Sequence, residues 1–160
     1  MREIQLTQGQ VAIVDDDMFE WLSKWKWRAS KSTHTKSYYA VRMPKRLLGK
    51  RAVVLMHREI MRAKNGENVD HINHDTLNNL RENLRICTRS QNMMNQRKHA
   101  NNASGYKGVT KHGSGWKARI VINGRLRHIK TWPTPELAAL AYDKAAKENY
   151  GEFANLNFPD

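Results

Sequence analysis

The segment from Asn68 to Arg97 contains the residues best suited to chemistry in this chain. Asp70 and His71 are adjacent, and Asn92 follows in the same segment. An Asp carboxylate and an Asn carbonyl are hard oxygen ligands that suit one Mg²⁺ ion with open water positions. An imidazole with an ordinary pKa of ~6.5 can take a proton from water near neutral pH. These residue types indicate a site that deprotonates water beside a metal ion.

The order of predicted elements explains how these residues can meet. Short strands are predicted over residues 69–72 and 84–88, a turn-rich loop over 73–79, and a helix over 91–97 that Ser90 can cap. Neighbours on a strand point to opposite sides, so Asp70 and His71 need a local twist or bulge to serve one site. The helix can bring Asn92 beside Asp70, and Asn83 can hydrogen-bond the imidazole.

Composition narrows the class of partner. The chain has 160 residues, a formal net charge of +13 and a single cysteine, Cys87. The positive charge favours a polyanion, most often nucleic acid. A single cysteine rules out an intrachain disulfide and a cysteine-based zinc ribbon. No apolar run approaches the ~20 residues of a membrane span, and the N-terminus lacks the apolar stretch of a secretory signal, so we expect a cytoplasmic protein.

The basic residues gather in two blocks that contain no acids. Residues 21–58 and residues 83–135 lack Asp and Glu and hold 11 Lys and Arg each, together 22 of the 28 in the chain. One interpretation is a solvated surface. The pattern fits better with a phosphate backbone held on either side of a few carboxylates that bind a metal.

The C-terminal third is predicted to form a three-stranded sheet with one helix. Strands are expected over residues 106–109, 116–122 and 125–132, and a helix over 135–150 with Thr134 as its cap. Asn123-Gly124 is a two-residue hairpin signal, and it sets the register of the last two strands. The predicted pairs are Ile122 with Arg125, Val121 with Leu126, Ile120 with Arg127, Arg119 with His128, Ala118 with Ile129, and Lys117 with Lys130.

This register assigns the two faces of the sheet different chemistry. One face collects Ala118, Ile120, Ile122 and Ile129, and the helix can cover it with the side that bears Leu137, Ala141 and Ala145. The other face collects Lys117, Arg119, His128 and Lys130 and stays exposed. Arg125 and Arg127 fall on the covered face, so we expect them at its periphery, reaching phosphate. A ribbon of this kind fits the DNA major groove.

The same C-terminal residues resemble the DNA-binding domain of plant ethylene-response factors, the AP-two/ERF type. The resemblance lies in Tyr106-Lys107-Gly108-Val109, Trp116, Ala138 to Asp143 and Asn155 to Pro159. In that family the sheet reads the major groove, which implies that five residues face DNA: Lys107, Lys117, Arg119, His128 and Lys130. Arg119 and His128 stand where plant members usually have Glu and Trp, so the resemblance implies no particular target sequence.

The central segment resembles the HNH nucleases of the ββα-metal class. The resemblance lies in Asp70-His71-Ile72-Asn73, Asn79, Asn83-Leu84-Arg85 and Ser90-Gln91-Asn92. It implies His71 as general base, Asp70 and Asn92 as metal ligands, Asn83 as the residue that orients His71, and His57 as a structural support. Asn in the third position of the motif implies Mg²⁺, with Mn²⁺ as a substitute, rather than zinc. The N-terminal stretch resembles the leader of phage homing endonucleases of this type.

The prediction is an α+β protein with four parts. These are an N-terminal β-rich region over 1–55, an HNH core over 56–99, a linker over 100–104, and an AP-two/ERF-like domain over 105–160. The resemblance implies a homing nuclease or nickase that hydrolyses double-stranded DNA to a 5′-phosphate and a 3′-hydroxyl in the host cytoplasm. We expect a monomer or weak dimer with no protein partner and no membrane association.

Two other functions were weighed against this one. The first is a non-catalytic, sequence-specific DNA-binding regulator with a decayed nuclease core. The intact set of Asp70, His71, Asn83 and Asn92 argues against it. The second is an RNA-binding protein, which is disfavoured because the predicted hairpin lacks exposed aromatic residues that stack on unpaired bases.

Overall fold

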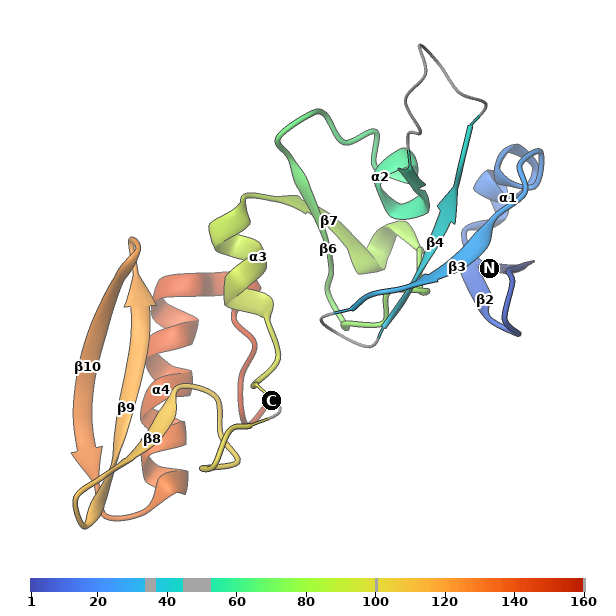
Figure 1. The fold of residues 1–160 in the computed structure, drawn as a ribbon. Coiled ribbons are helices and arrows are strands. Elements are labelled where there is room, and N and C mark those ends of the chain that lie inside the picture. Colours follow the sequence, from blue (N-terminus) through green and yellow to red (C-terminus); the bar gives the residue numbers. More distant parts are fainter. Residues whose placement is uncertain (34–36, 45–52, 100, 160) are drawn as a thin grey trace. The chain divides into compact units, whose positions relative to one another are not determined.

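The computed structural model describes residues 1–33, 37–44, 53–99 and 101–159 (Figure 1). The chain divides into two compact units, Met1–Arg89 and Ser90–Asp160. The mixed α+β class predicted from the sequence is confirmed. The predicted linker over 100–104 lies partly outside the described residues, at Ala100. Within the described ranges, no helix combines the length and the apolar character needed to cross a membrane.

The first unit combines three small antiparallel sheets with two short helices. Its elements are β1 (Arg2–Gln5), β2 (Val11–Val14), α1 (Asp16–Leu22), β3 (Arg28–Lys31), β4 (Tyr38–Arg42), β5 (Val54–Leu55), α2 (Met56–Ile60), β6 (Asn68–His71), the 3₁₀ turn η1 (Arg81–Asn83) and β7 (Leu84–Cys87). The sheets are β1-β2, β3-β4-β5 and β6-β7. Leu22, Trp27, Met56 and Leu84 belong to one buried cluster, so the N-terminal elements and the β6-β7 hairpin share a core.

The second unit is a three-stranded antiparallel sheet packed on one helix. Its elements are α3 (Arg89–Asn95), which begins one residue before the boundary, β8 (Val109–His112), β9 (Gly115–Ile122), β10 (Arg125–Trp132), α4 (Pro135–Tyr150) and the 3₁₀ turn η2 (Gly151–Phe153). The strand order is β10-β9-β8, which makes β10 an edge strand. The predicted bounds of β10 and α4 are confirmed, and the Thr134 side chain caps α4 by accepting from Leu137 N.

The first strand of this sheet starts later than predicted. The expected strand over 106–109 is wrong, because β8 runs from Val109 to His112. Gly108 has a φ of +74°, and a Cβ built on it would lie 2.0 Å from the Tyr142 ring. Only glycine fits this close approach in a left-handed backbone. Residues 106–108 therefore form a turn that packs against the ring of Tyr142 on α4.

A β-bulge corrects the predicted register of the hairpin. From Ile122↔Arg125 to Arg119↔His128 the predicted pairs are confirmed, but Lys130 pairs with Ala118 and Thr131 with Lys117. The predicted pairs of Ile129 with Ala118 and of Lys130 with Lys117 are wrong, because Ile129 is the extra residue of the bulge. The bulge places Trp132 opposite Trp116, and both pack against the core of this unit.

The buried side of α4 also differs from the prediction. The structure buries Ala138, Ala139, Tyr142 and Ala146, whereas Leu137 is 43% exposed. Ala141 and Ala145 lie at the margin of the core. The close approach of Tyr142 to Gly108 turns this side of the helix toward the core, and hydrophobic spacing alone does not reveal that contact.

Candidate functional site

Strand β6 carries the adjacent Asp70 and His71 into the interior of the first unit. The side chains are buried, with 7% and 5% of each residue exposed. The β6-β7 ladder pairs Asp70 with Arg85 and His71 with Leu84 in consecutive register. Because no bulge interrupts these pairs, the two side chains leave the strand on opposite sides. Each therefore has its own set of neighbours.

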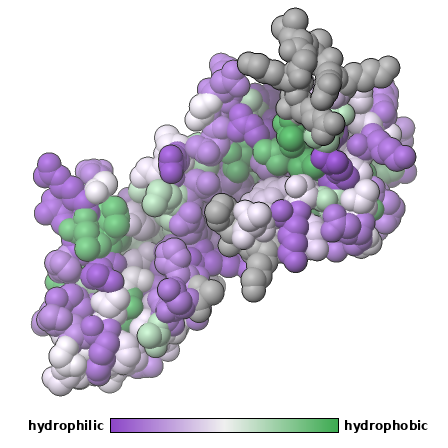
Figure 2. Space-filling model, in the orientation of Figure 1, coloured by the Kyte–Doolittle hydropathy of each residue, from purple (hydrophilic) through white to green (hydrophobic). Residues whose placement is uncertain are grey.

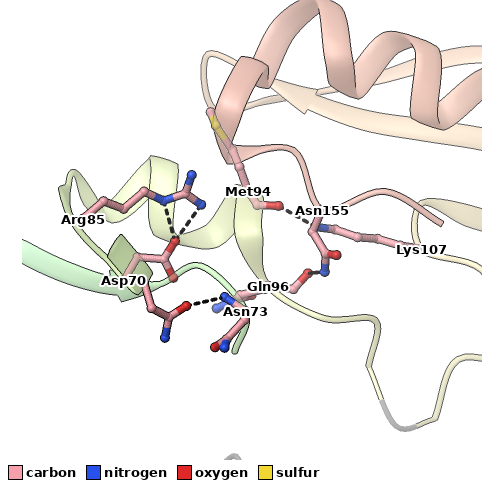
Figure 3. A network of polar contacts seen from close by, with 8 residues as sticks. Asp70, Asn73, Arg85, Met94, Gln96, Lys107 and Asn155 are labelled. Carbon is pink, nitrogen blue, oxygen red and sulfur yellow. Dashed lines mark hydrogen bonds and ion pairs between the residues drawn. The ribbon is translucent and has the colours of Figure 1, made fainter. Parts of the chain in front are cut away.

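The carboxylate of Asp70 forms an ion pair across the hairpin. Arg85 donates to Asp70 Oδ2 from Nε at 3.0 Å and from Nη2 at 2.8 Å (Figure 3). The two side chains are 8% and 11% exposed. Charges in such surroundings need a partner, because desolvation costs several kcal/mol per ion, on the order of what the attraction returns. Arg85 was not among the predicted site residues, since the register that sets it opposite Asp70 only appears once the hairpin has formed.

The imidazole of His71 lies in an aromatic pocket. The His57 ring lies edge-on at a centroid distance of 4.9 Å, and the Tyr39 ring at 6.2 Å. Burial lowers the pKa of His71, and the Asn79 side chain opposes this by raising it. Burial lowers the pKa of His57 to about 3, and electrostatic repulsion from His71 and Arg58 adds to this shift. Both rings are therefore neutral at pH 7, and a neutral imidazole can accept a proton.

The asparagines of the loop between β6 and β7 have contacts that differ from expectation. Asn83 Oδ1 accepts from Asn73 N at 3.0 Å, and Asn83 Nδ2 donates to the Asn78 carbonyl at 2.8 Å. Asn83 thus fastens the loop. Asn79 is fully buried, and its Nδ2 donates to the Leu77 carbonyl at 3.0 Å. Its side chain raises the pKa of His71, although its Oδ1 has no hydrogen-bond partner among the described residues. An asparagine that forms a turn and an asparagine that lies beside a histidine ring cannot be distinguished in the sequence. The sequence therefore predicts only that Asn79 belongs to a turn-rich loop.

The same loop is hydrogen-bonded to the N-terminal hairpin. Ile13 of β2 donates its N–H to the Leu77 carbonyl at 2.9 Å and accepts from Asn79 N at 2.8 Å. Asp15 Oδ2 accepts from Arg81 N at 3.0 Å. The loop is therefore held at both ends, by Asn83 within it and by β2 beside it.

Asn92 lies on α3, and its side chain is partly buried. Helix α3 belongs by its contacts to the second unit. There Lys107 Nζ donates to the Met94 carbonyl at 2.5 Å, and Asn155 Nδ2 to the Gln96 carbonyl at 3.0 Å (Figure 3). Among the described residues, no three or more His, Cys, Asp or Glu side chains gather as a metal cluster.

The exposed face of the C-terminal sheet is mixed rather than purely basic. The register places Lys117, Arg119 and His128 on the face away from α4. Val121 and Leu126 pair directly on that face, and they are 46% and 52% exposed. Figure 2 shows a group of hydrophobic side chains over the upper part of this hairpin. Ile129, the bulged residue, is also partly exposed, at 37%.

The bulge moves Lys130 to the other face. Paired with Ala118, Lys130 shares the α4 side of the sheet with Arg125 and Arg127, and the prediction that it lies beside Lys117 is wrong. All three cations are exposed along the edge strand β10. Lys107, which the resemblance placed toward DNA, is partly buried and bonded to α3.

Comparison with known proteins identifies the class of this chain. The HNH endonuclease family matches residues 54–94, the stretch that runs from β5 through β6 and β7 to α3. An uncharacterized HNH endonuclease, L560, of Acanthamoeba polyphaga mimivirus is 37% identical over 157 residues, which cover 94% of this chain and 76% of that protein. Protein 3.8 of Escherichia phage T7 is 28% identical over 107 residues, which cover 62% of this chain and 88% of that protein. No solved structure matches.

These matches and the ββα order of β6, β7 and α3 define a phosphodiester hydrolase. The chain belongs to the HNH endonuclease family. Enzymes of this family generally use a divalent metal ion, and their substrate is DNA.

Proposed function

We propose that this chain is a site-specific DNA nuclease of the homing type that uses Mg²⁺ and nicks one strand of a double helix. The observation that carries the proposal is the buried, neutral imidazole of His71 beside the ion-paired carboxylate of Asp70 on β6. One such centre per chain favours a single-strand break. Cleavage of both strands would require a second copy or a second event.

His71 is the general base of the proposed reaction. It accepts the proton of the water molecule that attacks the scissile phosphorus, and the bond from phosphorus to the 3′ oxygen breaks. The products are a 5′-phosphate and a 3′-hydroxyl. Burial, which lowers the pKa of His71, keeps the ring ready to accept this proton at neutral pH. Asn79, whose side chain raises the pKa of His71, is the proposed neighbour that orients the ring, and Asn83 acts indirectly by holding the loop that carries Asn79.

Asp70 and Asn92 are the proposed metal ligands. Their donor set of one carboxylate and one amide oxygen fits Mg²⁺, with Mn²⁺ as a substitute, and leaves positions for water. When bound, the ion supplies positive charge that stabilises the phosphate and the departing oxygen. The charge of Arg85 balances that of the Asp70 carboxylate in the protein interior. The His57 ring packs against the ring of His71 and supports it.

The C-terminal sheet is the proposed DNA-binding module, of the AP-two/ERF-like type. Lys117, Arg119 and His128 supply polar contacts on the exposed face. Val121 and Leu126 form the next pair on that face toward the hairpin turn, where thymine methyl groups can be contacted. Arg125, Arg127 and Lys130 line the edge strand and reach phosphate. Together these cations give an affinity that falls with salt.

A plasmid assay tests the nuclease. Supercoiled plasmid is incubated with the full chain and Mg²⁺, beside an EDTA control, the His71→Ala variant and a matched His99→Ala variant whose side chain is exposed. We expect nicked circles with the wild type and with His99→Ala, and none with EDTA or with His71→Ala. DNA affinity, measured in EDTA, should be the same for all three proteins.

Two results would contradict the proposal. Nicking that persists in His71→Ala removes the assigned base. Tight DNA binding without turnover in either Mg²⁺ or Mn²⁺ favours the non-catalytic regulator instead.

A further inference from the structure

We propose that Lys107 and Asn155 are positioning residues for cleavage: they hold the C-terminal end of α3, the helix that carries Asn92. The inference rests on the proposed function, in which Asn92 is a metal ligand. It separates Lys107 from the DNA-contacting residues of the sheet. Loss of Lys107 should therefore slow the chemical step and leave DNA affinity intact.

Helix α3 needs support from outside itself. It has seven residues, and helices of this length are marginal in isolation. The last carbonyls of a helix have no partner within it, and its C-terminus carries a partial negative charge. The last turn of α3 contains no Lys, Arg or His that could balance this charge.

Lys107 and Asn155 provide this support. The Lys107 ammonium donates to the Met94 carbonyl in the last turn of α3. The Asn155 amide donates to the carbonyl of Gln96, the residue that follows the helix (Figure 3). Lys98, which follows the helix, donates to the Gly105 carbonyl at 2.6 Å. All six residues belong to the second unit. The end of α3 is thus tied to two segments of the C-terminal module that are distant in sequence.

The support is itself rigidly mounted on α4. Asn157 Oδ1 accepts from Lys107 N at 2.6 Å, and Asn157 Nδ2 donates to the Lys107 carbonyl at 3.1 Å. Asp143, a buried residue of α4, accepts from the backbone N–H and the side-chain amide of Asn157. A chain of contacts therefore runs from α4 through Asn157 and Lys107 to α3. The next residue, Gly108, lies directly against the ring of Tyr142 on α4, where a Cβ would be only 2.0 Å from the ring.

The surroundings of Lys107 suit a contact within the protein better than a contact with phosphate. Burial lowers its pKa to about 8, although the Asp143 charge opposes this shift. Lys117 and the β10 cations lie on the surface strands, whereas the Lys107 ammonium is directed into the module. A lysine that reached DNA would give up its bond to α3.

The test uses the full chain with four substitutions, Lys107→Met, Asn155→Ala, Lys144→Met and Lys107→Arg. Lys107→Met keeps the length of the side chain and removes its donor and charge, and Asn155→Ala removes the second tie with a milder effect on folding. Lys144→Met makes the same chemical change at an exposed position of α4 and serves as the matched control. The measurements are duplex affinity in EDTA, the single-turnover nicking rate at saturating DNA with the Mg²⁺ concentration for half-maximal rate, and hydrogen exchange of α3 amides without metal.

We expect Lys107→Met to lower the saturated nicking rate by about 10- to 100-fold, the usual effect of losing a group that orients a metal ligand. The Mg²⁺ concentration for half-maximal rate should rise, and the α3 amides should exchange faster. Duplex affinity in EDTA should stay within about twofold of the wild-type value. Asn155→Ala should show the same pattern more weakly. Lys107→Arg, which restores a charged donor, should recover part of the rate.

Weaker duplex binding by Lys107→Met with an unchanged saturated rate would overturn the inference and return Lys107 to the DNA interface. Unchanged exchange of the α3 amides in both variants would overturn it as well. A wild-type chain that binds DNA and never cuts it would defeat the proposed function instead, and the exchange measurement would still decide whether Lys107 holds α3.

Discussion

The two hairpins of this protein use the same hydrogen-bonded ladder for opposite purposes. In β6-β7 the charged and polar side chains point inward, and Asp70 and His71 are almost fully buried. In β10 every residue except Trp132 is exposed, and its cations face water. Burial gives Asp70 and His71 fixed partners and gives His71 a lowered pKa, which are conditions for acid–base chemistry. Exposure leaves the β10 cations free to attract a polyanion over a distance.

The difference teaches that charge alone does not mark the reactive part of this chain. The exposed cations of β10 can attract a polyanion, and salt screens such an attraction. The proposed general base, His71, is one neutral ring whose neighbours are aromatic and amide groups. Substitutions in the two hairpins should therefore fail in different ways, through stability and pH dependence in β6-β7 and through salt dependence in β9-β10.

The largest effect is expected at Arg85. Arg85→Leu leaves the Asp70 carboxylate buried without its partner and should lower the free energy of unfolding by about 3–5 kcal/mol. Arg81→Leu is the matched control, because its ion pair with Asp17 is exposed and should contribute little to the free energy of unfolding. Urea unfolding in EDTA measures both. Equal losses in the two variants would show that burial does not distinguish the pairs.

The next effect concerns pH and His57. Its pKa is lowered to about 3 by burial and by the His71 and Arg58 charges, while Tyr39 packs on its ring. Between the unfolded value of 6.5 and about 3, the unfolded chain binds a proton that the folded chain does not, so stability falls as pH falls. The wild type should lose up to ~1.4 kcal/mol per pH unit more than His57→Gln in this range. Parallel stability curves from pH 7 to 4 would contradict this.

A smaller effect is expected on the exposed face of the sheet. Lys117→Gln combined with Arg119→Gln should weaken duplex binding and reduce the slope of log affinity against log salt by about two, if each residue neutralises one phosphate. The saturated nicking rate should not change. Lys144→Gln with Lys147→Gln, on the exposed side of α4, is the control. A salt slope that is the same in both double variants would remove these residues from the interface.

The smallest effect tests the apolar part of that face. If Val121 and Leu126 contact thymine methyl groups, a duplex with uracil in place of thymine should bind several-fold more weakly, at ~0.8 kcal/mol per lost methyl contact. Val121→Thr keeps the shape of the side chain and should reduce this preference. Titrations of the two duplexes in EDTA provide the measurement. Equal affinities for both would leave only the polar residues as readers.

Local signals in the sequence were sufficient for the hairpin turn and the last helix. Asn123 and Gly124 both have a positive φ, at 50° and 72°, as the predicted turn requires. Thr134, Pro135 and Gly151 mark the ends of α4 because caps depend on residues close in sequence. The Asp-His pair was placed on a strand for the same reason, since short strand patterns are local.

The features that escaped prediction all depend on contacts distant in sequence. The bulge at Ile129 brings Trp132 opposite Trp116, and only the packed core reveals that preference. The tie between Lys107 and Met94 and the pairing of Arg85 with Asp70 likewise require the finished fold. Among the asparagines of the loop, Asn79 and Asn83 have the same side chain and are both buried, and only the effect of Asn79 on the pKa of His71 distinguishes them.

The backbone hydrogen bonds between β2 and the loop that carries Asn79 have a consequence for the design of chimaeric nucleases. The matched nuclease segment begins at residue 54, yet the loop that steadies His71 uses the backbone of Ile13 as its neighbour. A chimaera that contained only residues 54–94 would lack Ile13. The carbonyl of Leu77 and the N–H of Asn79 would then lose the hydrogen bonds that they form with the Ile13 backbone. A nuclease segment moved into another protein should therefore include the N-terminal hairpin together with residues 54–94.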